Sequence, residues 1–243
     1  MCCNFLHSRR DWLRVTGATL GAGIIGNMVP GARAAEVPGN PRAGLTAADV
    51  LADLKAGNAR FVAGNPESPR RRPQDFAPLA TGQFPEAAVI ACSDSRVPPE
   101  ILFDQGVGDL FVIRVAGNVV GGSGAVVKGS IEYAVAELNV PLVVVLGHSE
   151  CGAVKAAVEH IDQHESLPGS IDGLVELIKP AVDQVRSEPG DKLANAIRAN
   201  VELGVEKLKV LEPLLAGPVA AGKVVVVGAT YNLSTGEVEW LEA

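Results

Sequence analysis

The stretch PLVVVLGH, residues 141–148, is a run of apolar residues, rich in valine, that ends in a histidine. Three other short runs are also largely apolar: AAVIAC (87–92), LFVIRVAG (110–117) and KVVVVGAT (223–230). Continuous rather than alternating apolar runs are typical of strands buried on both faces, as in a parallel sheet. The four runs therefore predict a mostly parallel central sheet.

Helical patterns separate these runs, and each is long enough to cross over between parallel strands. They lie near residues 123–138, 151–163, 171–186 and 191–215. This alternation predicts an α/β fold with helices on both faces of the sheet. The final segment EVEWLEA (237–243) alternates apolar and polar residues after a turn, which favours an antiparallel strand at the C-terminal edge.

An N-terminal helical arm is predicted ahead of the sheet. Thr46 can cap a helix that runs to about Ala63 and stops at Gly64. A basic, proline-rich connector, ESPRRRPQDFAP, follows at 67–78. Its arginines, Arg70–Arg72, are expected either to be solvated or to lie on a second subunit.

The first residues have the three parts of an export signal: paired arginines, a Gly- and Ala-rich apolar stretch, and small residues near position 34. The segment SRRDWLR (8–14) resembles a twin-arginine signal. We expect residues 1–34 to be cleaved, which leaves 35–243 as a single domain in the periplasm or otherwise exported, with no stable membrane insertion. A retained basic tail in the cytoplasm and an uncleaved membrane anchor are the alternatives.

The charge balance bears on the partners of the protein. The chain has a formal net charge of −7, and because residues 1–34 carry four arginines against one aspartate, the remainder is more acidic still. An acidic surface repels phosphate backbones, so no nucleic acid partner is expected.

Two cysteines and a histidine follow the predicted strands. Cys92 ends the first apolar run, His148 ends the third, and Cys151 begins the next helix. In open α/β sheets, ligands bind beyond the carboxyl ends of the strands. Two thiolates and an imidazole are a zinc ligand set with a fourth position open, which is the catalytic rather than the structural count. A disulfide between the two cysteines is the alternative for an exported protein.

Asp94 and Arg96 accompany Cys92 in the segment CSDSR (92–96). Next to a metal, a carboxylate can complete the coordination sphere or accept a proton from metal-bound water. A bidentate pair with Arg96 would hold Asp94 off the metal and leave that position to water. A structural ion pair at a strand end is the alternative.

The motifs CSDSR (92–96) and GHSECG (147–152) resemble those of β-class carbonic anhydrases, and the resemblance runs from about Thr46 to the C-terminus. It implies the reversible hydration of carbon dioxide to bicarbonate and a proton by a zinc-bound hydroxide, with one zinc per subunit on Cys92, His148 and Cys151. It also implies that Asp94 and Arg96 orient and deprotonate the zinc-bound water, and that Asp94 can become a fourth ligand in an inactive state.

The same resemblance extends to substrate-binding residues. Gln83 matches a glutamine that hydrogen-bonds substrate, and Gly152 matches a residue that offers its backbone N–H. Phe111 and Tyr133 match residues that line an apolar pocket at a subunit interface, with plain core packing as the alternative. If they line the site, the active unit is a homodimer or homotetramer.

Other functions remain open at this point. The same scaffold can hydrolyse carbon disulfide or carbonyl sulfide, and a zinc-binding α/β module without catalysis is possible. The glycine-rich segment 121–124 matches neither GxGxxG nor GxxxxGK[ST], the usual phosphate-binding patterns. His160 and His164 have a metal-ligand spacing on a helix, but a solvated helix end is the favoured interpretation.

Overall fold

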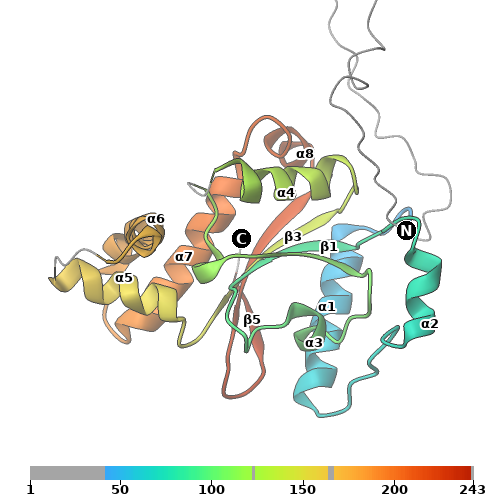
Figure 1. The fold of residues 1–243 in the computed structure, drawn as a ribbon, viewed down its shortest axis with the longest axis horizontal. Helices are drawn as coiled ribbons and strands as arrows, with labels where there is room; N and C mark the ends of the chain where they lie inside the picture. Colours follow the sequence, from blue (N-terminus) through green and yellow to red (C-terminus); the bar gives the residue numbers. More distant parts are fainter. Residues whose placement is uncertain (1–41, 122–123, 164–166, 242–243) are drawn as a thin grey trace, which may run out of the picture. The chain divides into compact units, whose positions relative to one another are not determined.

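The computed structural model describes residues 42–121, 124–163 and 167–241 (Figure 1). The predicted export signal at residues 1–34 and His164 lie outside the described residues. Within the described part of the chain, none of the helices has the length and apolar character needed to cross a membrane.

A five-stranded sheet forms the centre of the fold, with strand order β2-β1-β3-β4-β5. Four strands run parallel and the fifth is antiparallel to β4. They are β1 (Ala87–Ala91), β2 (Leu110–Arg114), β3 (Leu142–His148), β4 (Val225–Tyr231) and β5 (Val238–Leu241). The predicted parallel sheet with an antiparallel C-terminal edge is confirmed. All residues of β1 and β3 are buried, which explains why their sequences are continuously apolar.

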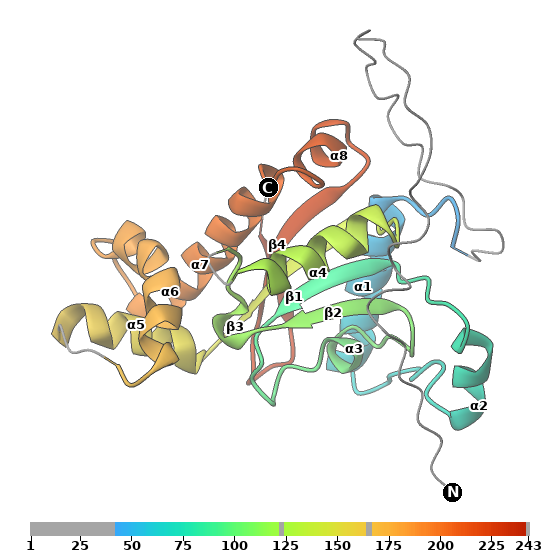
Figure 2. The ribbon, with the colours of Figure 1, turned by 45° about the horizontal axis from the view of Figure 1, so that its top comes forward.

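Helices cover both faces of the sheet, as predicted (Figure 2). On one face, Ile90 and Val145 pack against α4 (Ala125–Ala136) and α7 (Lys192–Lys209). On the other, Val89 and Val144 pack against α1 (Ala47–Val62) and α3 (Pro99–Leu102). The alternation of neighbouring side chains between the two faces is the ordinary consequence of a pleated strand.

The N-terminal helix α1 (Ala47–Val62) begins at a capping box between Thr46 and Asp49. Its apolar side packs on the sheet through Val50 and Leu54, which are both buried. The short helices α2 (Pro73–Phe76) and α3 (Pro99–Leu102) follow in the chain.

The connector between α1 and the sheet differs from the prediction. Arg70 forms an ion pair with Asp109, and Arg71 donates hydrogen bonds to the carbonyl oxygens of Gln105 and Glu100. Asp109 is fully buried, and a buried carboxylate needs a charged partner. The head groups of these arginines are therefore bound to their own chain rather than simply solvated.

The helix predicted over 191–215 is also shorter than expected. α7 ends at Lys209, turns follow, and a separate short helix, α8 (Ala216–Ala220), precedes β4. Pro213 lies in the turns, where it lacks a backbone N–H and disfavours helical geometry for the residue before it. The apolar spacing was helical across this boundary, but the proline prevents a continuous helix.

A third group of helices lies beyond the carboxyl edge of the sheet (Figure 1). α5 (Gly152–Gln163), α6 (Ser170–Val185) and the first half of α7 share one apolar cluster, which also contains Cys92 and Cys151. α7 reaches back against β3 at Gly147, where an added Cβ would lie 2.6 Å from Val201 Cγ2. Only glycine allows this close approach beside the end of β3.

Candidate metal centre

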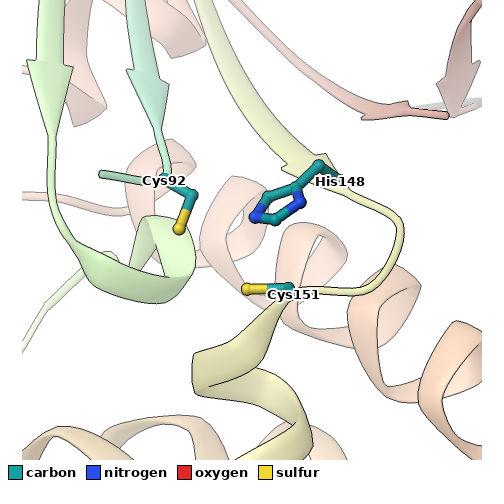
Figure 3. A group of neighbouring side chains, drawn as sticks. All are labelled: Cys92, His148 and Cys151. Atoms are coloured by element: carbon teal, nitrogen blue, oxygen red, sulfur yellow. The ribbon is translucent and has the colours of Figure 1, made fainter. Parts of the chain in front are cut away.

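Two strand ends and a helix start bring three potential metal ligands together (Figure 3). Cys92 directly follows β1, His148 is the last residue of β3, and Cys151 directly precedes α5. Their ligand atoms all lie within 4.8 Å of one another, and all three residues are buried. The parallel register causes this convergence, because it pairs Ala91 with Leu146 and so sets Cys92 level with the end of β3.

The imidazole of His148 is oriented by its own backbone neighbour. Its Nδ1 lies 2.8 Å from the carbonyl oxygen of Ser149. Because a carbonyl can only accept, Nδ1 carries the proton and the Nε2 lone pair faces the two sulfurs. Nε2 is buried and has no hydrogen-bond partner. A buried acceptor without a partner is costly, and a metal ion at this point would satisfy it.

The two thiols compete for one negative charge. A hydrogen bond from Cys151 lowers the pKa of the Cys92 thiol, while the pKa of Cys151 rises because its proton is held by the Cys92 sulfur. Both thiolates can form together only if a cation lies between them. Both cysteines are free, so the alternative of a disulfide between them is not observed. Two buried sulfurs and an imidazole nitrogen fit zinc.

Asp94 and Arg96 form a bidentate pair beside this cluster. Arg96 Nε lies 2.9 Å from Asp94 Oδ1, and Arg96 Nη2 lies 2.7 Å from Asp94 Oδ2. The Arg96 hydrogen bonds hold the pKa of Asp94 well below its usual range. Asp94 Oδ2 is 3.9 Å from His148 Nε2, so the carboxylate lies next to the three ligands while it is bound to the guanidinium.

Arg114 is a residue of the site that the sequence did not place beside the metal ligands. It ends β2, and its Nε donates to the Cys92 carbonyl oxygen at 3.0 Å. Its Nη2 also donates to the carbonyl oxygen of Asp94. The guanidinium thus fixes the backbone of the segment that carries the first cysteine. The only signal in the sequence is a charged residue inside an otherwise apolar strand.

The predicted substrate residues fall into two groups. Gly152 adjoins Cys151 as the first residue of α5. Gln83 is exposed in the loop before β1, and Phe111 is paired with Ala88 near the start of β1. At about 3.3 Å per residue, this is the opposite end of the strand from Cys92. Within one chain, the structure does not bring Gln83 or Phe111 to the cluster.

Phe111 packs against Tyr133 of α4, with ring centroids 6.1 Å apart. Tyr133 is 47% exposed, so plain core packing does not describe it. His160, expected to be solvated, is half-buried, and its Nδ1 is buried without a hydrogen-bond partner. Among the described residues, the only group of three or more potential ligands is the one around Cys92.

Comparisons with known proteins agree on one family. The family model described as carbonic anhydrase matches residues 87–238. A carbonic anhydrase of Mycolicibacterium smegmatis is 45% identical over 186 residues, which cover 76% of this chain and 89% of that protein.

Solved structures give the class. The β-carbonic anhydrase CcaA is 30% identical with a TM-score of 0.62, over 79% of this chain and 95% of that one. A structure from a study of two tetrameric β-carbonic anhydrases of Sordaria macrospora is 28% identical with a TM-score of 0.65. The match covers 79% of this chain and 95% of that one.

Replacing Arg96 should change how stability depends on pH. In the wild type, the lowered pKa of Asp94 gives stability that is present above the unfolded pKa of about 3.9 and is lost as the pH falls through the folded pKa. We expect Arg96→Gln to lower the melting temperature at neutral pH, and the difference from wild type to shrink in acid.

Arg198→Gln is the matched control, because Arg198 is similarly exposed and its nearest carboxylate, on Glu239, is 3.6 Å away without a bidentate contact. It should give a small difference at every pH. A difference for Arg96→Gln that stays constant down to strongly acid pH would contradict the assignment of the shift to Arg96.

Proposed function

The chain belongs to the β class of the carbonic anhydrase family, and we propose that its Cys92–His148–Cys151 site binds zinc and catalyses the reversible hydration of carbon dioxide. The observation that carries the proposal is the buried sulfur–nitrogen–sulfur cluster with an unpartnered Nε2, set beside a bidentate carboxylate–guanidinium pair.

In this proposal the residues of the cluster have separate tasks. Cys92, His148 and Cys151 would hold the metal, one ion per subunit, and the three protein ligands leave a fourth position open. When bound, zinc supplies the Lewis acidity that makes water a nucleophile at neutral pH. The hydrogen bond from Nδ1 of His148 to Ser149 keeps Nε2 available as a ligand.

Asp94 is the proton acceptor for the attacking water in this proposal. Its carboxylate is ionised at neutral pH because Arg96 stabilises the charge, so it accepts a hydrogen bond from the attacking water and orients it. The proton passes to Oδ2 and from there to solvent, which Asp94 contacts through its 17% exposed side chain.

Arg96 also restrains Asp94. Both carboxylate oxygens accept hydrogen bonds from its guanidinium, which keeps them off the fourth metal position. Loss of this pair would free Asp94 to become the fourth ligand in an inactive state. Gly152 lies next to Cys151 at the start of α5, and in this proposal its backbone N–H would donate to a substrate oxygen.

The substitution Asp94→Asn tests the function. It removes the proton acceptor but none of the three ligands, so we expect carbon dioxide hydration to fall by about 10²- to 10⁴-fold with zinc retained at one per chain. Stopped-flow hydration assays and metal analysis measure the two quantities. Glu202→Gln, an exposed change on α7, is the control and should alter neither.

The same assays separate the alternative functions. Wild-type protein that hydrolyses carbon disulfide or carbonyl sulfide but does not hydrate carbon dioxide would contradict the proposal in favour of the hydrolase. Zinc binding without turnover of any of these substrates would indicate a module without catalysis. A relative that is 45% identical and is named carbonic anhydrase favours hydration of carbon dioxide.

We also propose that the protein works as a homodimer or homotetramer. Gln83 and Phe111 lie at the opposite end of β1 from Cys92, so they can line a site only in another copy of the chain. The Phe111–Tyr133 pair lies on the edge strand β2 and on α4, and Tyr133 is 47% exposed. The related Sordaria macrospora enzymes are tetrameric.

Tyr133→Glu tests this interface. A charge on an exposed aromatic side chain at an apolar contact should dissociate the oligomer, measured as a fall in mass by light scattering. Ile171→Glu on α6 is the matched control, since Ile171 is 50% exposed, and it should leave the mass unchanged. A wild-type monomer, or equal effects of both substitutions, would contradict the proposal.

Export remains a proposal supported by the twin-arginine pattern at Arg9 and Arg10. We expect the double substitution Arg9→Lys with Arg10→Lys to retain the protein in the cytoplasmic fraction of a host with this pathway, measured by cell fractionation. Arg14→Lys is the control and should be exported, because lysine is usual at that position of the signal. Equal export of the two variants would contradict the proposal.

A further inference from the structure

One of the two sulfurs accepts a hydrogen bond from the backbone. The N–H of Gly117 lies 3.2 Å from Cys92 Sγ. Gly117 belongs to the 3-10 turn η3 (Ala116–Asn118), which is drawn in pale green next to the Cys92 sulfur in Figure 3. Its φ of +68° favours glycine, and an added Cβ would lie 2.8 Å from Ile178 Cδ1. The turn thus fits its place tightly, and its position determines where the N–H points.

A side chain from a distant helix holds this turn. Asn200 Nδ2 on α7 donates to the carbonyl oxygen of the same Gly117 at 2.8 Å. Asn200 is only 6% exposed, and its neighbours Ala196, Ile197 and Val201 are buried apolar residues. An amide in such surroundings is costly unless it is hydrogen-bonded, so the contact is strongly favoured over alternatives.

We propose that Asn200 is a positioning residue of the metal centre, which fixes Gly117 so that its N–H donates to the Cys92 sulfur. This inference rests on the proposed zinc site. An N–H donor to a ligating thiolate orients the sulfur lone pairs and withdraws negative charge, so it sets both the geometry and the donor strength of Cys92. The side chain acts through Gly117 and touches none of the ligands in the described contacts.

A second buried asparagine offers a matched control. Asn58 on α1 is 7% exposed, and its Nδ2 donates to the carbonyl oxygens of Leu102 and Gly236 at 3.0 and 2.9 Å. Both asparagines therefore satisfy buried backbone carbonyls. Asn58 joins α1 to α3 and to the turn before β5, away from the ligand cluster. A role in stability alone should appear at both positions, whereas a role in metal binding should appear only at Asn200.

The experiment compares Asn200→Ala and Asn200→Leu with Asn58→Ala in the full chain. Each variant is first checked for a cooperative thermal transition, and its zinc dissociation constant is then measured by competition with a chromophoric chelator. We expect both Asn200 variants to bind zinc about 10- to 100-fold more weakly than wild type. Asn58→Ala should melt at a lower temperature and bind zinc within about twofold of wild type.

Cobalt substitution gives a second measurement that loss of stability alone does not alter. In the Asn200 variants, the thiolate-to-cobalt charge-transfer band should shift in energy, because Cys92 loses its fixed N–H donor, and in Asn58→Ala it should not. Folded Asn200 variants with unchanged zinc affinity and an unchanged cobalt spectrum would overturn the inference. Equal weakening of zinc binding in Asn58→Ala would overturn it as well.

Two outcomes concern the wild type. If the wild-type protein binds no metal, the proposed function is contradicted. The inference about Asn200 is contradicted separately, by Asn200 variants that bind zinc as the wild type does. If neither Asn200 variant folds, the wild type loaded with ¹¹³Cd decides the matter by NMR. A scalar coupling between the Gly117 amide proton and the cadmium supports the hydrogen bond on which the inference depends, and its absence overturns the inference.

Discussion

The parallel pairing of β1 with β3 is the constraint on which the rest of the site depends. It places Ala91 opposite Leu146, so the residues that follow β1 meet the last residues of β3 at one edge of the sheet. Both strands are buried on both faces, and a slip of one residue would exchange the side chains that pack against the helices of the two faces, which close-packed cores do not tolerate. The register that the core requires therefore also fixes the separation of Cys92 and His148. Catalytic geometry and core packing are set by the same interaction.

That convergence creates an electrostatic problem, because it buries two sulfurs and an unpartnered imidazole nitrogen at one point. The hydrogen bond between the thiols lets one of them ionise at the expense of the other, which lowers the pKa of Cys92 and raises that of Cys151. A divalent cation would relieve both the competition of the thiols and the unsatisfied nitrogen. The carboxylate of Asp94 would be attracted to the same cation, and its bidentate pair with Arg96 offsets that attraction. The site is arranged so that its ligands need a metal and its base is kept from becoming a ligand.

The features of the fold and of the site that the sequence predicts are those for which a local residue pattern directly reflects the physical cause of the structure. Continuous β-branched runs predicted the strands, and polar groups at their carboxyl ends predicted where ligand atoms meet, because parallel strands end at one edge. The predicted helix over 191–215 is too long, because the spacing of apolar residues does not reveal the turn around Pro213. Arg70 was expected in solvent because the sequence does not show that the buried Asp109 needs it. Asn200 gave no signal, since its partner is 83 residues away and is a backbone carbonyl, which every residue has.

The position of α7 suggests why a site for so small a substrate needs so much surrounding structure. Carbon dioxide has no charge and makes few polar contacts, so its binding energy is too small to move the metal-ligating side chains into position. The protein must therefore hold these side chains in place before the substrate binds. α7 restrains β3 directly and the residue after β1 through the turn at Gly117. Val201 packs against β3 at Gly147, one residue before His148. Asn200 donates a hydrogen bond to the turn whose N–H donates to Cys92. Adjacent residues of one helix thus restrain the two parts of the chain that carry His148 and Cys92. Packing within the protein supplies the rigidity that so small a substrate cannot induce.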